Sequence, residues 1–359
     1  MIWDELQKPF LILAPMEGVT DVIFRQVIAH AGRPDLFFTE FTNVSSYASE
    51  KGRWNALERL EIAPTDSPII AQIWGKNPAH FAKCAKALEP LGFAGIDLNF
   101  GCPDKNVNRA GGGAAMIKTP ELAIECFENA RKNTNLPVSI KTRLGWKEVD
   151  EFRDWLPTVL SVHPAALTIH LRTKKEMSKV PAHYELIPEI ITLRNQLSPD
   201  TKLIINGDIK DRAHALELHA KYPEVDGFMI GRGVFANPYC FTDHQPTQEE
   251  LMELLKLHLR LFEEHEKERE DSHSRSIHKE HENSSLRSIR VGGSELASEH
   301  LEQGRERSGD EKNCSRALPY EPLKHFFKIY INNFPGASDL RAKLMKTHSV
   351  AEAKHILGL

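Results

Sequence analysis

The stretch Gly95-Ile96-Asp97-Leu98-Asn99, followed at once by Phe100-Gly101-Cys102-Pro103, shows the pattern that decides the fold of this chain. A short apolar run, typical of a buried strand, ends in polar or special residues and leads toward a segment with helical spacing. Such runs recur along the first two thirds of the sequence. Eight strands are predicted, over residues 10–14, 36–39, 69–73, 95–99, 138–142, 166–170, 202–206 and 227–230.

Helices are predicted between most of these strands, for example over residues 78–89, 120–133, 151–162 and 213–220. Alternation of strand and helix implies parallel strands joined by right-handed crossovers. Eight such units suit a closed (β/α)8 TIM barrel, a fold of about 250 residues. A doubly wound open sheet is the alternative, but no Gly-x-Gly-x-x-Gly follows the first strand. We therefore predict an α/β protein with a catalytic barrel over residues 1–245.

A second, all-helical domain is predicted over residues 246–359, with amphipathic segments at 249–264, 322–331 and 339–357. It is interrupted from about 266 to 316 by a stretch rich in Glu, Arg, Ser, His and Gly. Such a composition buries too little apolar surface to offset the entropy lost on ordering. We expect this insert to be disordered or loosely helical.

Composition places limits on the protein's partners. The net charge of −4 gives no overall nucleic-acid signature, so an RNA contact would need a local basic surface. No apolar run approaches the ~18 residues that cross a bilayer, and the N-terminus lacks a signal-peptide pattern. The five cysteines are scattered, and no two of them form a Cys-x-x-Cys pair. This pattern argues against a disulfide framework and against a metal site. We expect a cytoplasmic monomer with no bound metal and no membrane contact.

Polar or special residues gather where the predicted strands end. They are Pro15, Met16, Glu17, Gln72, Asn99, Lys141, His170, Asn206, Gly207, Asp208, Gly231 and Arg232. The carboxyl ends of barrel strands converge on one face, where barrel enzymes build their active sites. A polar residue at the end of one strand would carry little meaning, but polar residues at the ends of most of the eight strands predict a single site.

Cys102 stands out because Gly101 and Pro103 place it on a tight, exposed loop. Packing in the core is the commoner role of a cysteine, but this loop position favours a reactive thiol. Lys141 and His170, on adjacent strand exits, can stabilise negative charge on an electron-rich ring such as a reduced flavin. Gln72 offers an amide suited to the flavin's imide edge.

Two glycine-containing turns, Asn206-Gly207-Asp208 and Gly231-Arg232-Gly233, follow the last two strands. Those loops form the usual phosphate site of barrel enzymes, because glycine lets backbone N–H groups approach an anion. Two ordinary turns remain the alternative interpretation.

The chain resembles the bacterial tRNA-dihydrouridine synthases over nearly its whole length. Seven motifs in the family's order carry the resemblance: Ala-Pro-Met-Glu-Gly-Val-Thr-Asp at 14–21, Gln-Ile-Trp-Gly at 72–75, Asn-Phe-Gly-Cys-Pro at 99–103, Lys-Thr-Arg-Leu-Gly at 141–145, Ile-His-Leu-Arg-Thr at 169–173, Asn-Gly-Asp at 206–208 and Ile-Gly-Arg-Gly at 230–233. The tail motif Phe334-Pro335-Gly336-Ala337 is also similar to that family's tRNA-contacting domain.

The resemblance implies an FMN-dependent cycle in which NADPH reduces the flavin and the flavin passes a hydride to C6 of a uridine in tRNA. Cys102 would donate the proton to C5, giving 5,6-dihydrouridine. The flavin would be held by the strand-exit residues named above, and the tRNA by Asn99 and Arg172 at the base and by Arg341, Lys343 and Lys346 in the tail. The target base must leave the stack to reach such a site.

Two departures and two alternatives stand beside this interpretation. The family's usual His-Gly-Arg-Thr reads His170-Leu171-Arg172-Thr173 here, and the polar insert is unlike a compact family tail. One alternative is a flavin-dependent oxidoreductase of free pyrimidines, such as a dihydroorotate or dihydropyrimidine dehydrogenase, which lacks the tail. The other is an RNA-binding protein that has lost catalysis, and the presence of Cys102, Lys141 and His170 argues against it.

Overall fold

The computed structural model of the chain describes residues 1–289, 320–332 and 334–359, with side chains placed for all of these except 54, 55 and 270–289. Eight parallel strands form one sheet in the order β1-β8-β7-β6-β5-β4-β3-β2. They are β1 Phe10–Leu13, β2 Phe37–Asn43, β3 Ile69–Trp74, β4 Gly95–Phe100, β5 Val138–Arg143, β6 Ala166–His170, β7 Lys202–Asn206 and β8 Gly227–Ile230.

The sheet closes on itself between β1 and the residues just before β2. Ile12 and Leu36 form an isolated parallel bridge. The N–H of Leu13 donates to the carbonyl of Leu36 at 3.3 Å, and the N–H of Asp35 donates to the carbonyl of Leu11 at 2.9 Å. The predicted (β/α)8 barrel is therefore confirmed, with all eight predicted strands present.

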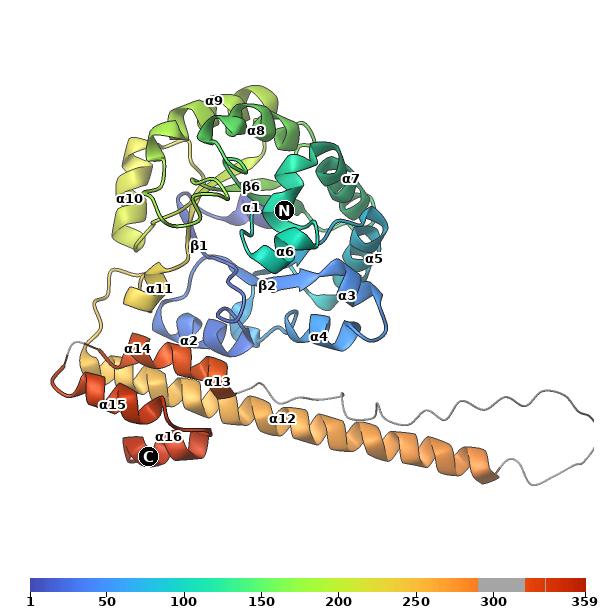
Figure 1. Cartoon of the computed structure of the whole chain (residues 1–359), viewed down its shortest axis with the longest axis vertical. Helices are drawn as coiled ribbons and strands as arrows, with labels where there is room; N and C mark the ends of the chain where they lie inside the picture. The colour runs from blue at the N-terminus through green and yellow to red at the C-terminus, as the bar shows by residue number, and fades with distance from the viewer. Residues whose placement is uncertain (290–319, 333) are drawn as a thin grey trace, which may run out of the picture.

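Helices surround the strands (Figure 1). A short helix, α1 Ile2–Glu5, precedes the barrel. The outer helices and the shorter helices in the loops are α2 Val22–Gly32, α3 Val44–Ala48, α4 Arg53–Glu58, α5 Pro78–Leu88, α6 Lys105–Arg109, α7 Pro120–Arg131, α8 Phe152–Leu160, α9 Ile187–Leu197, α10 Arg212–Lys221 and α11 Gly233–Ala236. Single turns of 3-10 helix are η1 Pro64–Asp66, η2 Glu89–Leu91, η4 Val149–Glu151 and η5 Tyr184–Leu186, and a longer one is η3 Gly113–Lys118.

Several outer helices start at a side chain that caps their first turn. The carboxylate of Asp21 accepts from the N–H of Phe24 at the start of α2, and Asp211 accepts from His214 at the start of α10. Such caps satisfy N–H groups that have no partner within the helix. The caps fix where each helix begins, and therefore where the loop between the preceding strand and that helix ends. They thereby set the length of these loops at the barrel mouth.

The inside of the barrel changes from apolar to polar along its axis. Alternate strand residues face inward, and toward the amino ends of the strands they form an apolar cluster of Trp3, Phe10, Ile12, Ala14, Leu36, Phe38, Ile70, Ala166, Ile204 and Met229. Further along the strands, toward their carboxyl ends, most inward positions are polar. This polar layer is Gln72, Asp97, Asn99, Ser139, Lys141, Thr168, His170 and Asn206.

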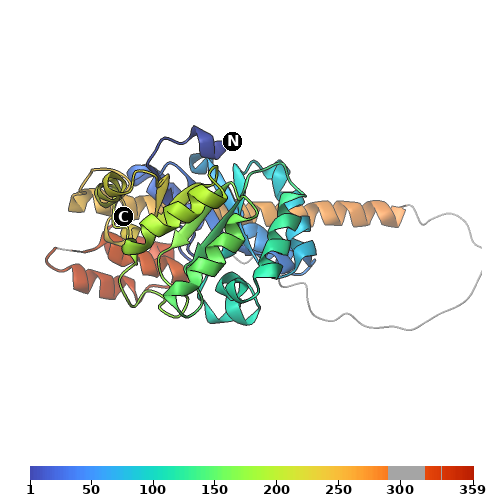
Figure 2. The same cartoon turned by 90° about the horizontal axis from the view of Figure 1, so that it is seen from above.

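The rest of the chain is helical and lies beside α2 and α11 (Figure 1). It consists of α12 Gln248–Ile289, α13 Tyr320–Leu323, η6 Lys324–Phe326, α14 Phe327–Tyr330, α15 Ala337–Leu344 and α16 Val350–Leu357. Figure 2 shows that α12 extends well past the barrel.

Buried side chains join this helical part to the barrel. The ring of Phe24 on α2 lies 4.6 Å from that of Phe326, measured between centroids. His258 of α12 is buried beside both rings, and its Nδ1 lies 2.8 Å from the hydroxyl of Tyr330. The interface therefore resembles a protein core more than a loose contact between domains.

Two sequence expectations for this region need correction. The helix predicted at 249–264 continues through the first part of the polar insert to Ile289, because packing holds its first half and no Gly or Pro occurs before Gly292. The rest of the insert, residues 290–316, lies outside the described residues. The helix predicted at 339–357 is two helices, since Ser349 caps a new one at Val350.

Candidate active site

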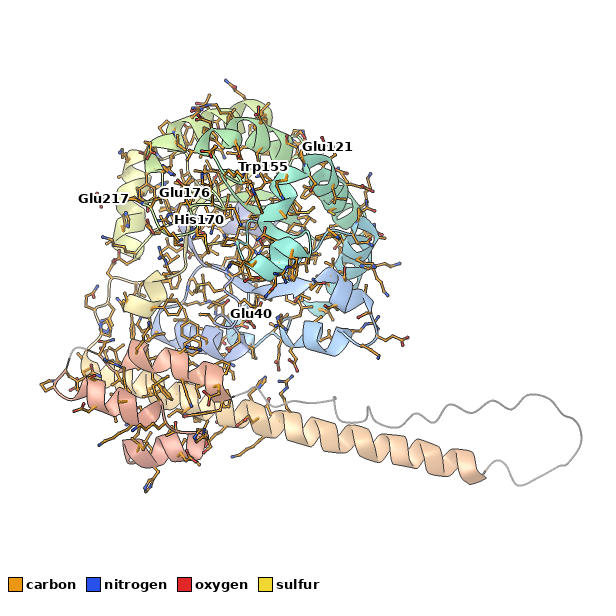
Figure 3. All side chains as sticks on the ribbon, in the orientation of Figure 1. Glu40, Glu121, Trp155, His170, Glu176 and Glu217 are labelled. Carbon is orange, nitrogen blue, oxygen red and sulfur yellow. The ribbon has the colours of Figure 1, made fainter. Side chains whose placement is uncertain are left out.

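A cavity of about 1620 Å³ opens where the strands end. Its lining includes most of the residues predicted from the strand exits: Pro15, Met16, Glu17, Asn99, Cys102, Lys141, His170, Asn206, Gly207, Asp208, Gly231 and Arg232. In Figure 3, His170 lies inside the ring of helices, whereas Glu121 and Glu217 belong to the outer helices α7 and α10. These residues come from six of the eight strand ends, and Phe41 of β2 and Trp74 of β3 bring the other two into the same cavity lining.

The loop that carries Cys102 is fixed by hydrogen bonds on both sides of the residue. The side-chain oxygen of Asn99 accepts from the N–H groups of Gly101, at 3.1 Å, and Cys102, at 2.9 Å. The carbonyl of Cys102 accepts from the Asn108 amide and from the N–H of Ala114, each at 3.0 Å. These four bonds hold the backbone of the thiol in one position.

Gly113 allows the following turn to pass close to Cys102. Its φ of +59° lies in the left-handed region that favours glycine. An added Cβ would lie 2.7 Å from the side chain of Val107 and 2.8 Å from the carbonyl oxygen of Cys102. No other residue type fits there without moving the thiol loop.

The thiol itself is partly buried, and burial raises the pKa of Cys102 above its usual value. Asp104, two residues further along the chain, and the cations Arg143 and Lys141 have smaller effects on this pKa. The side chain therefore carries its proton at neutral pH. A protonated thiol is suited to donate a proton, whereas a nucleophilic cysteine needs a lowered pKa.

Arg143, which the sequence analysis did not select, ties the Cys102 loop to the loop after β6. Its Nε donates to the carbonyl of Gly101 at 2.8 Å, and its Nη1 donates to the carbonyls of Thr173, at 3.1 Å, and Met177, at 3.0 Å. Burial lowers its pKa to about 10, so it stays charged at pH 7. Its spacing of two from Lys141 was the available signal, because alternate strand residues share a face.

Lys141 is half-buried in the cavity wall, and its Nζ donates to the side-chain oxygen of Asn206 at 3.3 Å. The amide nitrogen of Asn206 donates in turn to the carbonyl of Met229 at 2.7 Å. Burial, followed by repulsion from Arg143, lowers the pKa of Lys141 to about 8. Lys141 is therefore charged at pH 7 and loses its charge shortly above it.

His170 lines the cavity with a buried Nδ1 that has no hydrogen-bond partner among the described residues. Burial and then the nearby cations Arg143 and Lys141 lower the pKa of His170 well below its usual value, so its imidazole is neutral. A buried polar atom without a partner is costly, and in a cavity wall it is suited to hydrogen-bond a ligand.

Asp208 anchors the part of the cavity predicted to bind phosphate. Its carboxylate pairs with Arg172, with Arg232 at 2.7 Å, and with the N–H of Ala182 at 3.1 Å. Burial is the largest single influence on the pKa of Asp208 and opposes ionisation, but the hydrogen bonds from Arg172 and Ala182 and the charges of Arg172 and Arg232 together lower that pKa. Asp208 thus holds the cationic Arg232 at the cavity edge.

Gln72 lies outside the cavity lining, unlike the sequence prediction. It is fully buried, its Nε2 donates to Asp97 at 2.7 Å, and its Oε1 accepts from Asn99 at 2.9 Å. Asp97 also accepts from the hydroxyl of Ser139 at 2.6 Å. Asp97 and Ser139 were not predicted as site residues, although a carboxylate inside the apolar run 95–100 was a signal.

The other predicted contacts also lie away from the cavity. Arg172 is buried, donates to the carbonyl of Val180 at 2.5 Å and pairs with Asp208. In the helical part, Arg341 donates to the carbonyl of Ile331 at 2.5 Å. Lys343 and Lys346 are exposed on and just after α15.

Six cations lie on the segments that follow β3, β4 and β6, at the end of the barrel where the cavity opens. They are Lys76, Lys105, Arg109, Lys118, Lys174 and Lys179; Lys174 is half-buried and the other five are exposed, and none forms an ion pair with a described residue. The Nζ atoms of Lys118 and Lys174 lie 4.3 Å and 4.5 Å from the ring centroid of Trp146. We call these six residues the basic rim. Despite the chain's negative net charge, the basic rim is suited to a polyanion.

The described residues contain no group of three or more His, Cys, Asp or Glu side chains that could hold a metal ion. Among them, too, no helix combines the length and apolar character needed to span a membrane.

Comparisons with known proteins agree with this geometry. The sequence matches the model of the Dihydrouridine synthase (Dus) family over residues 12–318. It is 44% identical to "Probable tRNA-dihydrouridine synthase 2" of Bacillus subtilis (strain 168), covering 99% of this chain and 95% of that protein. It is also 44% identical to "Probable tRNA-dihydrouridine synthase" of Staphylococcus epidermidis, covering 99% and 94%.

Among solved structures, an old yellow enzyme homologue from Zymomonas mobilis aligns with a TM-score of 0.44 at 13% identity, covering 65% of this chain and 87% of that one. The family match spans most of the chain, and the relatives match it almost end to end. The chain therefore belongs to the dihydrouridine synthase family.

Proposed function

We propose that this protein reduces the C5–C6 double bond of uridines in tRNA to give 5,6-dihydrouridine, with FMN as cofactor and NADPH as reductant. The observation that carries the proposal is a protonated thiol, Cys102, held rigidly at a cavity whose wall also contains Lys141 and a neutral His170. The names of the relatives, probable tRNA-dihydrouridine synthases, support the same reaction.

The cavity suits FMN on its donor chemistry. Among the described residues, His170 offers a buried nitrogen without a partner, and Lys141 offers a half-buried ammonium, as the polar edge of a flavin requires. Asn206, Gly207, Asp208, Gly231 and Arg232 would hold the phosphate-bearing tail, with Arg232 supplying positive charge. Pro15, Met16 and Glu17 would lie along the ring.

When bound and reduced by NADPH, FMN supplies the hydride that C6 of the uracil accepts. Cys102 would donate its proton to C5, so that one hydride and one proton add across the double bond. The resulting thiolate would regain a proton from solvent, which its raised pKa favours. Asn99, whose side chain lines the cavity beside the thiol, would contact the base.

The RNA substrate is supported by features outside the cavity. The basic rim faces the side from which a flipped nucleotide would enter. The final segment, residues 317–359, contains six Lys and Arg against three Asp and Glu. Lys343 and Lys346 would add phosphate contacts there, while Arg341 is committed to the backbone of the helical part.

The test is to incubate the purified protein with NADPH and either an unmodified tRNA transcript or free uracil, and to measure dihydrouridine by mass spectrometry. We expect a yellow protein absorbing near ~450 nm and product only in the tRNA. Product from free uracil alone would support the dehydrogenase alternative. A protein that binds tRNA but holds no flavin would support the non-catalytic alternative.

A further inference from the structure

A line of buried polar side chains runs across three strands to the Cys102 loop. On neighbouring strands, Ser139 pairs in register with Asp97, and Asp97 with Gln72. The hydroxyl of Ser139 donates to Oδ1 of Asp97 at 2.6 Å, Gln72 donates to Oδ2 at 2.7 Å, and Asn99 donates to Gln72 at 2.9 Å. We call Asp97, Gln72 and Asn99 the relay.

The two ends of the relay fix its direction. At one end, the backbone N–H groups of Gly101 and Cys102 can only donate, so Asn99 must present its oxygen to them. At the other end, an ionised Asp97 can only accept, so Gln72 must present its nitrogen. Each amide has one orientation that satisfies both neighbours.

We infer that Asp97 is a positioning residue for Cys102: acting through Gln72, it sets which atom Asn99 presents to the thiol loop. This inference rests on the proposed role of Cys102 as proton donor. Asp97 touches neither the loop nor the cavity.

The burial of these groups argues against simple packing. Asp97 and Gln72 are fully buried, and Asp97 forms no direct ion pair among the described residues. Burial raises the pKa of Asp97 to about 6, and its hydrogen bonds and the charge of Lys141 offset the burial only in part. A carboxylate at such a position is costly unless its hydrogen bonds serve a purpose. The layer below fills the same barrel with apolar side chains such as Ile70 and Ile204. The polar layer therefore costs stability that an apolar layer would not.

Reversing the polarity of the relay tests the inference. Asn99→Asp places carboxylates on both sides of Gln72, which can donate to one but must turn its oxygen toward the other. If either carboxyl takes up a proton, it can donate to Gln72 and the relay is restored. The loss of this hydrogen bond should therefore become more complete as pH rises. In the double variant with Asp97→Asn, the amide of residue 97 can donate to Gln72, and Gln72 can donate to residue 99. The carboxylate at residue 99 still accepts from the N–H groups of the loop.

Two readouts apply to full-length protein, with wild type, N99D and N99D/D97N compared from pH 6 to pH 9. The first is hydrogen-exchange protection of the N–H groups of residues 101 and 102, corrected for the intrinsic rate. The second is kcat for dihydrouridine formation in tRNA. Both variants carry a charge at residue 99, so its direct effects on Cys102 and on the base are common to both.

We expect N99D and N99D/D97N to agree within about threefold at pH 6 and to differ by about tenfold or more at pH 9, the double variant being higher in both readouts. Asn129→Asp on the exposed side of α7 is the matched control and should behave as wild type. Equal pH profiles for the two relay variants would overturn the inference.

A second pair covers the case in which N99D does not fold. Asp97→Asn alone keeps the relay's direction, because its nitrogen can face the hydroxyl oxygen of Ser139, and should retain protection at residues 101 and 102. Asp97→Ala should lose it by about tenfold; retained protection would overturn the inference. Exchange needs neither tRNA nor turnover, so a wild type that makes no dihydrouridine would refute the proposed function and still leave the relay tested.

Discussion

At the scale of single residues, burial sets the charge of each group in the cavity wall. It raises the pKa of Cys102, lowers that of Lys141 to about 8 and lowers that of His170 well below its usual value. At pH 7 the wall thus presents a neutral thiol, an ammonium and a neutral imidazole. One group can give a proton, one can stabilise negative charge, and one can accept a hydrogen bond or donate one.

Replacing Cys102 by Ala should separate the two halves of the reaction. Flavin content and NADPH oxidation should stay near wild type, because the thiol is not among the cofactor contacts. Dihydrouridine formation should fall about 100-fold or more, the usual contribution of a general acid. Stopped-flow absorbance and nucleoside mass spectrometry measure the two steps. Full product formation by C102A would refute the acid role.

Lys141 should make FMN binding depend on pH. Its lowered pKa of about 8 means that it is charged below this value and neutral above it. Fluorescence titration of apoprotein should therefore show FMN affinity falling severalfold from pH 7 to pH 9. Lys141→Met should bind about tenfold more weakly at pH 7 and lose this dependence. An unchanged pH dependence in K141M would assign it to another group.

Glu40 should weaken the fold as pH rises. It accepts from the N–H of Gly18 at 2.6 Å, and burial, with Asp21 and Glu17 nearby, raises its pKa from 4.5 to about 7. When a carboxyl has a higher pKa in the folded state than in the unfolded state, the free energy of unfolding falls as pH rises from the lower pKa to the higher one. Glu40→Gln keeps the bond from Gly18 and should gain up to about 3 kcal/mol over wild type between pH 5 and pH 8.

Urea unfolding at the two pH values measures that gain. Glu121→Gln makes the same change on the exposed side of α7 and should show no difference between them. A gain for Glu40→Gln that is equal at both values would show that Glu40 does not titrate in this range.

At the scale of elements, the basic rim should supply salt-dependent binding. Replacing Lys118 and Lys174 by Ala removes two cations that contact the ring of Trp146 and form no ion pair with a described residue. The Kd for tRNA should rise about tenfold at moderate salt, and the slope of log K against log salt should fall by about 1–2. The matched control replaces Lys132 and Lys221, at the carboxyl ends of α7 and α10. If the rim variant keeps the wild-type slope of log K against log salt, the basic rim does not contact the phosphates of the tRNA.

The contact of η6 and α14 with the barrel should stabilise both parts. Phe326→Ala removes a buried ring from between Phe24 and His258 and should cost about 3–5 kcal/mol. tRNA binding should weaken more than FMN binding, because the loss is remote from the cavity. Calorimetry and binding assays measure the two effects. The exposed neighbour His325 provides a control, since its replacement by Ala should change neither.

Strands and their exits could be predicted from the sequence because each depends on a local pattern. Partners could not: nothing in the sequence showed that Gln72 bonds Asp97 and Asn99 rather than a ligand, or that Arg172 bonds Asp208. Those pairings join residues far apart in the chain. The extent of α12 was also missed, because a polar helix is stabilised by what its first half packs against.

At the scale of the whole molecule, the barrel and the helical part meet around the segment 58–61. From α12, His265 lies 2.9 Å from Glu61, and Arg269 pairs with Glu58 at 2.5 Å. Between them, Arg59 pairs at 2.7 Å with Glu17, which lines the cavity. Composition indicated two parts, but the segment that joins them carries no sequence motif.

This shared segment has a consequence for how the protein would choose its substrate. A helical part fixed to the cavity edge by ion pairs and buried rings keeps one distance from Cys102. In the proposed reaction, the helical part would therefore hold the folded tRNA at a fixed distance from Cys102. The uridine that reacts is the one whose separation from the bound phosphates equals that fixed length, whatever bases flank it.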